Sequence, residues 1–258
     1  MTGMIHSDRR DGICTITIEN EGKRNALDYS MAGDIADILA DLEADEEDHV
    51  VILTGAGEKA FSAGFDLSID RTDQSSDDSS EWERMITNLS EYEFPTIGRI
   101  NGVTYGGAVE IAAACDLRVG VRGVTFGITP AKIGLVYEGD AINRVMSLIG
   151  PAKTKEMLFT GEPIDAEHAY EIGLLNYVVD RDTLDDRVNE LAETMASNAP
   201  LSLKYMKEIV DALLEKDRLT DAERKWIARL REESFASEDH AEGVEAFRKD
   251  REPEFKGR

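Results

Sequence analysis

The chain has 258 residues, of which 41% are hydrophobic, and this is enough to bury one sizeable core without forcing a division into two domains. Its 53 acidic residues against 29 Lys and Arg give a formal net charge of −24, and a field of that sign repels nucleic acids and anionic membranes. The sequence also lacks any run of about 18 apolar residues and any apolar region near its start, so neither a membrane span nor a signal peptide is expected, and we predict a cytoplasmic protein.

The first part of the chain predicts strands that alternate with helices. Residues 12–20 alternate apolar and polar side chains as a half-buried strand does, and residues 49–57 form a more continuous apolar strand that ends in glycines. Between them, apolar side chains recur at helical spacing through residues 30–45, with Ser30 as the predicted N-cap. This is a strand, helix, strand opening.

Residues 94–121 then predict a strand, a glycine turn, a short Ala-rich helix and a second strand, and residues 124–128 predict one more strand. Helices dominate further on, at residues 152–161, 166–173, 183–199, 200–216 and 220–237. The pattern predicts one α/β core over residues 1–198 and a helical region over residues 199–258. Residues 68–80 are predicted to be a flexible loop that, together with the helix that follows it near residues 82–85, caps the site that the core builds.

The same composition bears on redox state, metals and habitat. Cys14 and Cys115 lie far apart and outside any CxxC or His-rich spacing, so we expect two buried thiols rather than a disulfide or a zinc site. The four histidines show no ligand spacing, so no metal is predicted. The acidic excess favours a halophilic protein in a salt-rich cytosol, because at molar salt the Debye length is about 3 Å and like charges are screened.

Two glycine turns and one glutamate carry the candidate chemistry. Gly64 follows a predicted strand and lets the backbone turn so that the N–H of Phe65 faces outward. Gly107 lies at the entry to the Ala-rich helix, where N–H groups and the helix dipole favour an anion. Two such N–H groups can form an oxyanion hole around an oxygen atom that gains negative charge. Glu110 is either a buried proton-transfer group with a raised pKa or a carboxylate that only complements the helix dipole.

Ordered motifs along nearly the whole chain carry a family resemblance. They are EGKRNALDYSM, VVILTGAGEKAFSAGFDL, RINGVTYGGAVEIAAACDLRV, TFGITPAKIGLV, LFTGEPIDAEHAYEIGLLNYVV, APLSLKYMKE and EGVEAFRKDREPEFKGR. On these motifs the chain resembles the crotonase superfamily, which has the enoyl-CoA hydratase and isomerase fold. The resemblance implies an α/β spiral of strand, strand, helix units and a C-terminal helical region that builds trimers or dimers of trimers. It also implies an acyl-CoA thioester as the substrate, with no separate cofactor.

The resemblance also implies roles for particular residues. Carried over by motif, the N–H groups of Phe65 and Gly107 form the oxyanion hole. In similar enzymes the KRNAL turn and the FSAGFDL segment line the CoA nucleotide, and a phenylalanine approaches CoA from an adjacent subunit. The implied CoA-binding residues are Lys23, Arg24, Ala26, Ala63, Asp66, Leu67 and, from the adjacent subunit, Phe247. Asp250 stands where the family commonly has Lys, and the candidates to replace that contact are Lys249 and Lys256.

Hydratases of this superfamily use two glutamates, one of which matches Glu110. The other is missing, because the match to FGxPE places Pro130, which has no ionisable group, at its position. TPAKIGLVY resembles the methylmalonyl-CoA decarboxylase branch, which has a tyrosine where Tyr137 stands. The sequence therefore predicts an acyl-CoA lyase that decarboxylates a methylmalonyl-CoA-like substrate, with Glu110 or Tyr137 as the proton donor or as the group that orients the substrate carboxylate. Glu138 and Asp140 are expected to be surface acids, unless one folds back and restores a second carboxylate.

Four other interpretations stay open. Tyr137 can be an ordinary packing residue. The enzyme can be an enoyl-CoA hydratase or isomerase in which Glu110 is the only matched acid. The protein can bind CoA without catalysis, if the oxyanion hole persists without competent acid chemistry. An RNA-binding role, which one superfamily member has, is opposed by the net charge of −24.

Overall fold

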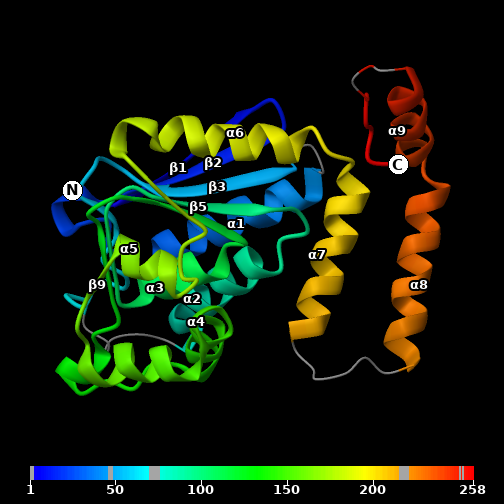
Figure 1. The fold of residues 1–258 in the computed structure, drawn as a ribbon. Coiled ribbons are helices and arrows are strands. Elements are labelled where there is room, and N and C mark those ends of the chain that lie inside the picture. The colour runs from blue at the N-terminus through cyan, green and yellow to red at the C-terminus, as the bar shows by residue number, and fades with distance from the viewer. Residues whose placement is uncertain (1–2, 46–48, 70–75, 215–220, 250, 252) are drawn as a thin grey trace.

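Figure 1 shows an α/β body with the C-terminal helices standing beside it. The computed structural model describes residues 3–45, 49–69, 76–214, 221–249, 251 and 253–258. A six-stranded sheet has the order β1-β2-β3-β5-β7-β10, and a four-stranded sheet has the order β4-β6-β8-β9. The larger sheet contains β1 (Met4–Arg10), β2 (Ile13–Glu19), β3 (Val50–Gly55), β5 (Thr96–Ile100), β7 (Leu117–Val121) and β10 (Tyr177–Val179). The smaller contains β4 (Ala60–Ser62), β6 (Val103–Tyr105), β8 (Thr125–Gly127) and β9 (Ile164–Asp165).

Successive segments repeat one unit, in which a strand of the larger sheet and a strand of the smaller sheet precede a helix. β3 and β4 are followed by α2, β5 and β6 by α3, and β7 and β8 by α4. The repeat confirms the predicted α/β spiral of strand, strand, helix units. The helices are α1 (Tyr29–Asp45), α2 (Ser76–Ser90), α3 (Gly107–Ala114), α4 (Gly139–Thr160), α5 (Ala166–Glu171), α6 (Leu184–Ala196), α7 (Pro200–Leu214), α8 (Asp221–Ala236) and α9 (Glu238–Lys249).

The core lies on both sides of the larger sheet. β3 is buried along its whole length, as expected for a parallel strand with helices on both faces, and Figure 1 shows α6 and α1 on opposite sides of it. Met31 and Leu39, on the predicted apolar stripe of α1, are buried. The predicted cap at Ser30 was wrong, because Ser30 lies inside the first turn and Asp28 Oδ1 accepts the hydrogen bond from the N–H of Met31 at 2.8 Å.

α2 is the main departure from the predicted elements. It begins at Ser76, inside the stretch 68–80 that was predicted to be a loop, while residues 70–75 of that stretch lie outside the described residues. Its start is rich in Ser and Asp, which are indifferent helix formers. Met85 and Leu89 are nevertheless buried against the core, and this packing outweighs local propensity. β1 and β10 were also not predicted.

The helices predicted in the last third are present, but α4 is longer than predicted. The prediction began it at residue 152, whereas it begins at Gly139. Gly150 has a φ of 72° and interrupts the helical backbone. The prediction therefore covered only the part of α4 that follows this break. α9 was not predicted. α7, α8 and α9 follow α6, and in Figure 1 they stand to one side of the sheets.

Asp116 ties α7 to the core. Its Oδ2 accepts hydrogen bonds from the N–H of Thr96 at 2.7 Å and from Nζ of Lys207 at 2.8 Å. These contacts join the end of α3 to β5 and to α7. Asp116 therefore fixes the end of α3 against β5, the strand that precedes this helix, and against the first of the C-terminal helices.

The composition also predicted the state of the two cysteines and the absence of a membrane span. Cys14 and Cys115 are buried and form no disulfide with each other, as predicted, and burial raises the pKa of the Cys115 thiol to about 12. No helix in the described part of the chain combines the length and the apolar character that a membrane span requires.

Candidate active site

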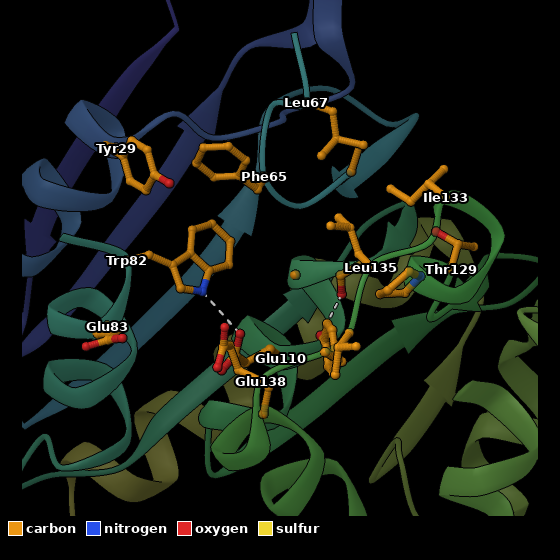
Figure 2. A pocket seen from close by; sticks show the side chains of 17 residues that line it. Tyr29, Phe65, Leu67, Trp82, Glu83, Glu110, Thr129, Ile133, Leu135 and Glu138 are labelled. Carbon is orange, nitrogen blue, oxygen red and sulfur yellow. Dashed lines mark hydrogen bonds between the residues drawn. The ribbon is translucent and has the colours of Figure 1, made fainter. Parts of the chain in front are cut away.

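A cavity of about 330 Å³ opens between α2, α3 and the segment that precedes α4 (Figure 2). Apolar and aromatic side chains dominate its walls, with a few convergent polar groups, as is typical of small-molecule sites. The cavity is lined by Tyr29, Ala63, Phe65, Leu67, Trp82, Glu83, Gly106, Gly107, Glu110, Thr129, Pro130, Ile133, Leu135, Val136, Tyr137, Glu138 and Ala141. The fold therefore brings to one place all four residues predicted to be catalytic, Phe65, Gly107, Glu110 and Tyr137.

The backbone N–H groups of Phe65 and Gly107 are close neighbours. Phe65 forms a parallel bridge with Leu27, in which Gly64 O accepts from Leu27 N at 2.9 Å. On the other side of the bridge, Asp66 N donates to Leu27 O at 2.8 Å. Because hydrogen bonds alternate in direction along a strand, the N–H of Phe65 points away from Leu27. A methyl group placed on Gly107 would lie 3.6 Å from Phe65 N, and one placed on Gly64 would lie 2.6 Å from Gly107 N.

Gly107 is also the first residue of α3. The N–H groups of a first helical turn have no acceptor within the helix, and the helix dipole places partial positive charge there. A side chain at Gly107 would come within 2.6 Å of the Trp82 ring, so glycine is required for this packing. An oxygen atom that gains negative charge beside these N–H groups would be stabilised by both of them.

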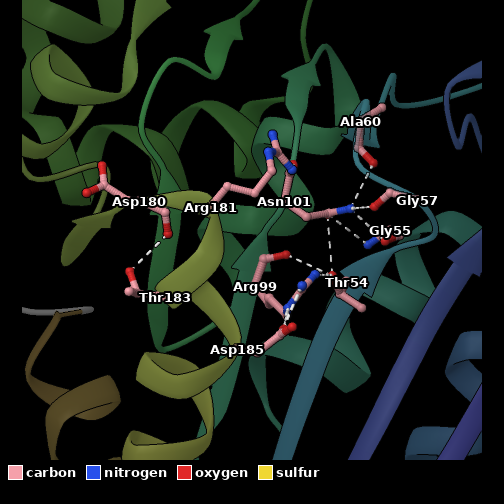
Figure 3. A network of polar contacts seen from close by, with 10 residues as sticks. All are labelled: Thr54, Gly55, Gly57, Ala60, Arg99, Asn101, Asp180, Arg181, Thr183 and Asp185. Atoms are coloured by element: carbon pink, nitrogen blue, oxygen red, sulfur yellow. Dashed lines mark hydrogen bonds and ion pairs between the residues drawn. The ribbon is translucent and has the colours of Figure 1, made fainter.

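A buried polar network holds the loop between β3 and β4, which leads to Phe65. Figure 3 shows Asn101 at its centre, with Nδ2 donating to the carbonyl oxygens of Gly55 and Gly57, each at 2.7 Å. Nη1 of Arg181 donates to the carbonyl of Asn101 at 2.9 Å. No buried side-chain nitrogen or oxygen atom among the described residues lacks a hydrogen-bond partner, so these bonds fix the position of the loop.

Glu110 lies in the first turn of α3 and is only 8% exposed. Its Oε2 accepts a hydrogen bond from Nε1 of Trp82 at 3.1 Å (Figure 2), and its Oε1 accepts one from Nη1 of Arg144 at 3.3 Å. Burial raises the pKa of Glu110, and the contacts with Trp82 and Arg144 oppose this rise. A carboxylate that only complemented the helix dipole would need neither the burial nor the cavity, so the geometry favours the proton-transfer interpretation.

Tyr137 reaches the same helix end from the segment before α4. Its hydroxyl donates to the carbonyl oxygen of Gly106 at 3.0 Å, so it also has the contacts of a packing residue that fixes the start of α3. Burial, together with the charge of Glu110, raises the pKa of the Tyr137 phenol, which stays protonated at neutral pH. Its one proton is engaged by Gly106, and the lone pairs of its oxygen remain able to accept.

Pro130 and Glu138 decide how many acids face the cavity. Pro130 begins a short 3-10 helix and supplies only an apolar wall, as expected. Glu138 was expected to be a surface acid, and it is exposed at the start of α4, but it also lines the cavity next to Glu110 (Figure 2). Its charge contributes to the raised pKa of Glu110. Three glutamates therefore line the cavity, Glu83, Glu110 and Glu138, and Glu138 comes from a position that the FGxPE match does not cover.

The residues expected to bind CoA lie on two adjoining segments. Ala63 N donates to the carbonyl of Arg24 at 2.9 Å, and Nζ of Lys23 donates to Oδ2 of Asp66 at 2.5 Å. Burial acts to raise the pKa of Asp66, but hydrogen bonds from Lys23 and Ser68 outweigh it and hold that pKa below its ordinary value. The KRNAL turn and the FSAGFDL segment are thus brought together, as the resemblance implied.

The remaining residues predicted to contact CoA differ in their exposure. Ala26 is buried beneath this surface, and Leu67 is 62% exposed at the mouth of the cavity. Phe247 belongs to α9, but its side chain lies outside the described residues, as does Asp250. Both lysines suggested to replace the missing contact are exposed: Lys249 and Lys256. No group of three or more His, Cys, Asp or Glu side chains suited to a metal ion occurs in the described part of the chain.

Tyr29 and Arg144 were not predicted to have a role in the site, and Trp82 and Glu83 were predicted only as part of the helix that caps it. Tyr29 and Trp82 flank Phe65, with ring centroids 4.6 and 6.0 Å from its own, and Glu83 lies beside them. Arg144 would have been found if α4 had been predicted to begin before it, because three- and four-residue spacing then places it on the face that meets the cavity.

Comparison with known proteins agrees with this geometry. The sequence profile of the enoyl-CoA hydratase/isomerase family matches residues 8–258. The carnitinyl-CoA dehydratases of Citrobacter koseri and Salmonella enteritidis are 33% and 32% identical over 262 residues, with 100% of each chain covered. A crystal structure of an enoyl-CoA hydratase/carnithine racemase from Magnetospirillum magneticum has a TM-score of 0.91 at 30% identity, covering 98% of this chain and 96% of that one. The enoyl-CoA hydratase of Bacillus anthracis gives 0.88 at 29%, covering 98% and 99%. The chain therefore belongs to the enoyl-CoA hydratase/isomerase family of the crotonase superfamily.

Proposed function

We propose that the protein catalyses the reversible addition of water to the double bond of an α,β-unsaturated acyl-CoA thioester, with Glu110 as the principal proton-transfer group. The observation that carries the proposal is the pair of carboxylates, Glu110 and Glu138, in one cavity beside the N–H groups of Phe65 and Gly107. The name of the relatives, carnitinyl-CoA dehydratase, describes the same type of reaction in the direction of water loss.

The geometry suits each step of hydration. The Glu110 carboxylate takes a proton from water as the water oxygen bonds to the β-carbon, and the electrons of the double bond move to the thioester oxygen. The N–H groups of Phe65 and Gly107 stabilise the resulting enolate, and one donor in such a site is worth about 2.7–4 kcal/mol. The α-carbon then takes a proton from a carboxyl group of Glu110 or Glu138, and the thioester carbonyl re-forms. No electron is gained or lost, so the reaction needs no cofactor other than the CoA of its substrate.

The cavity walls indicate an acyl group that ends in a cation. They combine the rings of Tyr29, Phe65 and Trp82 with the carboxylates of Glu83 and Glu138. An aromatic face attracts an ammonium group by about 0.5–2 kcal/mol, and the carboxylates add to this attraction. The carnitinyl group in the name of the relatives has a trimethylammonium end, which agrees with such a site.

Decarboxylation of a methylmalonyl-CoA-like substrate is the second candidate. It is favoured by Pro130, which stands where a hydratase has its second glutamate, and by Tyr137, which reaches the end of α3. Two observations rank it below hydration. Such a substrate would bring a further carboxylate into a cavity that Glu83, Glu110 and Glu138 already line, and the proton of Tyr137 is engaged by a backbone carbonyl.

A panel of four thioesters tests both candidates. We expect the purified protein to hydrate crotonyl-CoA, 4-trimethylammonio-but-2-enoyl-CoA and its neutral isostere 5,5-dimethylhex-2-enoyl-CoA, and to release no carbon dioxide from methylmalonyl-CoA. The cationic thioester should exceed its neutral isostere in kcat/KM by about tenfold, because one cation–π contact and two carboxylates act on the charge alone. Loss of absorbance of the conjugated thioester and release of labelled carbon dioxide are the two measurements.

Each possible outcome of this panel has one meaning. Rapid carbon dioxide release without hydration would establish the decarboxylase and refute the hydratase. Equal rates for the cationic and neutral isosteres would refute the cationic acyl group and leave hydration standing. Binding of CoA without turnover of any thioester would establish the catalytically inactive CoA-binding alternative.

We also propose that copies of the chain assemble through α7 into a homotrimer or a dimer of trimers. One face of α7 exposes a stripe of large apolar side chains at helical spacing, formed by Met206, Val210, Leu213 and Leu214. Light scattering should therefore give three or six times the 28.5 kDa of one chain, and the double variant Met206→Glu and Val210→Glu should lower that mass. A monomeric wild-type protein would contradict the proposal.

A further inference from the structure

The Glu110 carboxylate is held by donors from two different helices. Trp82, on α2, donates from its indole Nε1 to Oε2 at 3.1 Å, and Figure 2 shows the indole N–H directed at the carboxylate. Arg144, on α4, donates from Nη1 to Oε1 at 3.3 Å. The side chains of Glu110 and Arg144 are 10% and 23% exposed, so this ion pair is partly shielded from solvent. Each oxygen of the carboxylate therefore has its own donor, and the carboxyl plane is fixed.

Two donors leave room for the reaction. A carboxylate can accept about four hydrogen bonds, two at each oxygen, so one acceptor position per oxygen remains for a water molecule or for a substrate proton. Trp82 also packs over the first residue of α3, since a methyl group on Gly107 would lie 2.6 Å from its ring carbon Cζ2. The same indole thus donates to Glu110 and packs beside Gly107, whose N–H group is one of the two in the proposed oxyanion hole.

The donors also act on the charge of Glu110. Burial favours the neutral acid and raises its pKa, and Glu138 and Asp140 reinforce that rise. Trp82 and Arg144 oppose it because they bind the ionised form. The charged and titratable groups near the carboxylate or in the same cavity, among the described residues, are Tyr29 on α1, Glu83 on α2, Tyr137 and Glu138 before α4, and Asp140 and Arg144 on α4. A base that takes a proton from water must be ionised before the reaction begins.

We propose that Trp82 and Arg144 are positioning residues, which hold the Glu110 carboxylate ionised and aimed at the carbon atoms beside the thioester. This inference rests on the proposed hydration. A salt bridge that only stabilised the fold would instead affect the free energy of unfolding and leave the pH dependence of catalysis where it was.

The test compares variants that act on Glu110 in opposite directions. In Arg144→Gln and in Trp82→Phe the carboxylate loses a partner of its ionised form, so the acid limb of kcat/KM should move to higher pH, by about one unit for the arginine variant. We expect kcat to fall about tenfold or more and KM to change little, and Arg144→Lys should recover part of the loss. Asp140→Asn removes a charge that raises the pKa of Glu110, so its acid limb should move to lower pH, with kcat near that of the wild type.

A second measurement keeps the inference testable if no hydration is found. Glutamate labelled with ¹³C at the carboxyl carbon gives an NMR resonance for Glu110 that the Glu110→Gln variant identifies, and its titration follows the pKa directly. Opposite displacements in Arg144→Gln and Asp140→Asn would support the inference even if the proposed substrate proved wrong. Unchanged titration and unchanged acid limbs, with a lowered melting temperature in the arginine variant, would overturn it and leave a structural ion pair.

Discussion

Replacing Glu110 with Gln is expected to lower kcat for hydration by about 10²- to 10⁴-fold, which is the usual contribution of one positioned acid or base. The amide has nearly the same shape as the carboxylate but cannot take a proton from water. It also cannot satisfy both neighbours, because one of the two donors, Trp82 or Arg144, must then face an NH₂ group. KM should change much less than kcat, since Glu110 acts on the reacting atoms rather than on CoA.

The control for this substitution is Glu156→Gln, on the exposed surface of α4, which should leave kcat unchanged. Thermal unfolding of both variants would show that neither has lost its fold. If Glu110→Gln kept more than about a tenth of the wild-type kcat, another group would carry the proton and Glu110 would be only a polar neighbour of the helix end. Steady-state kinetics with the preferred enoyl-CoA substrate is the measurement.

The parts of the site that sequence could predict are those fixed by local backbone geometry. Phe65 and Gly107 follow glycines at the end of a strand and at the start of a helix, and such places expose N–H groups whatever the remainder of the chain does. Glu110 belongs to the same short helix as Gly107, so the sequence alone places the two residues close together. Their meeting in one cavity follows from adjacent parallel units of the spiral, which the family resemblance supplied and the structure confirmed.

The parts that sequence missed depend on contacts between distant segments. Trp82 and Arg144 lie 28 residues before and 34 residues after Glu110, on helices that both begin earlier than predicted. No local propensity reports on such a contact. The position of Glu138 depends on where the 3-10 helix ends and where α4 begins. Finding Pro130 in place of an acid excluded a carboxylate at that one position but not at Glu138. The prediction of decarboxylation by way of Tyr137 followed from a motif, whereas the cavity is lined by Glu138 as well as Glu110.

Replacing Gly64 with Ala is expected to lower kcat by about 10²- to 10³-fold, the cost of losing one oxyanion donor. The new methyl group would lie 2.6 Å from Gly107 N and 2.7 Å from the carbonyl oxygen of Tyr105. Both are backbone atoms that cannot rotate away, so the strand end that carries Phe65 must move relative to α3. Gly64 also has a φ of +83°, which costs a residue with a side chain about 1–2 kcal/mol.

Gly123 separates the two causes, because it has nearly the same backbone conformation without the close approach. Its φ is +82°, and a methyl group there meets no heavy atom within 4 Å among the described residues. Gly123→Ala should therefore lower the free energy of unfolding by about 1–2 kcal/mol and leave kcat unchanged, whereas Gly64→Ala should lower both. Denaturant unfolding and steady-state kinetics of the two variants measure these effects. Equal kcat values in the two variants would mean that the distance between Phe65 and the start of α3 does not set the rate. The N–H groups of Phe65 and Gly107 would then lose their assigned role.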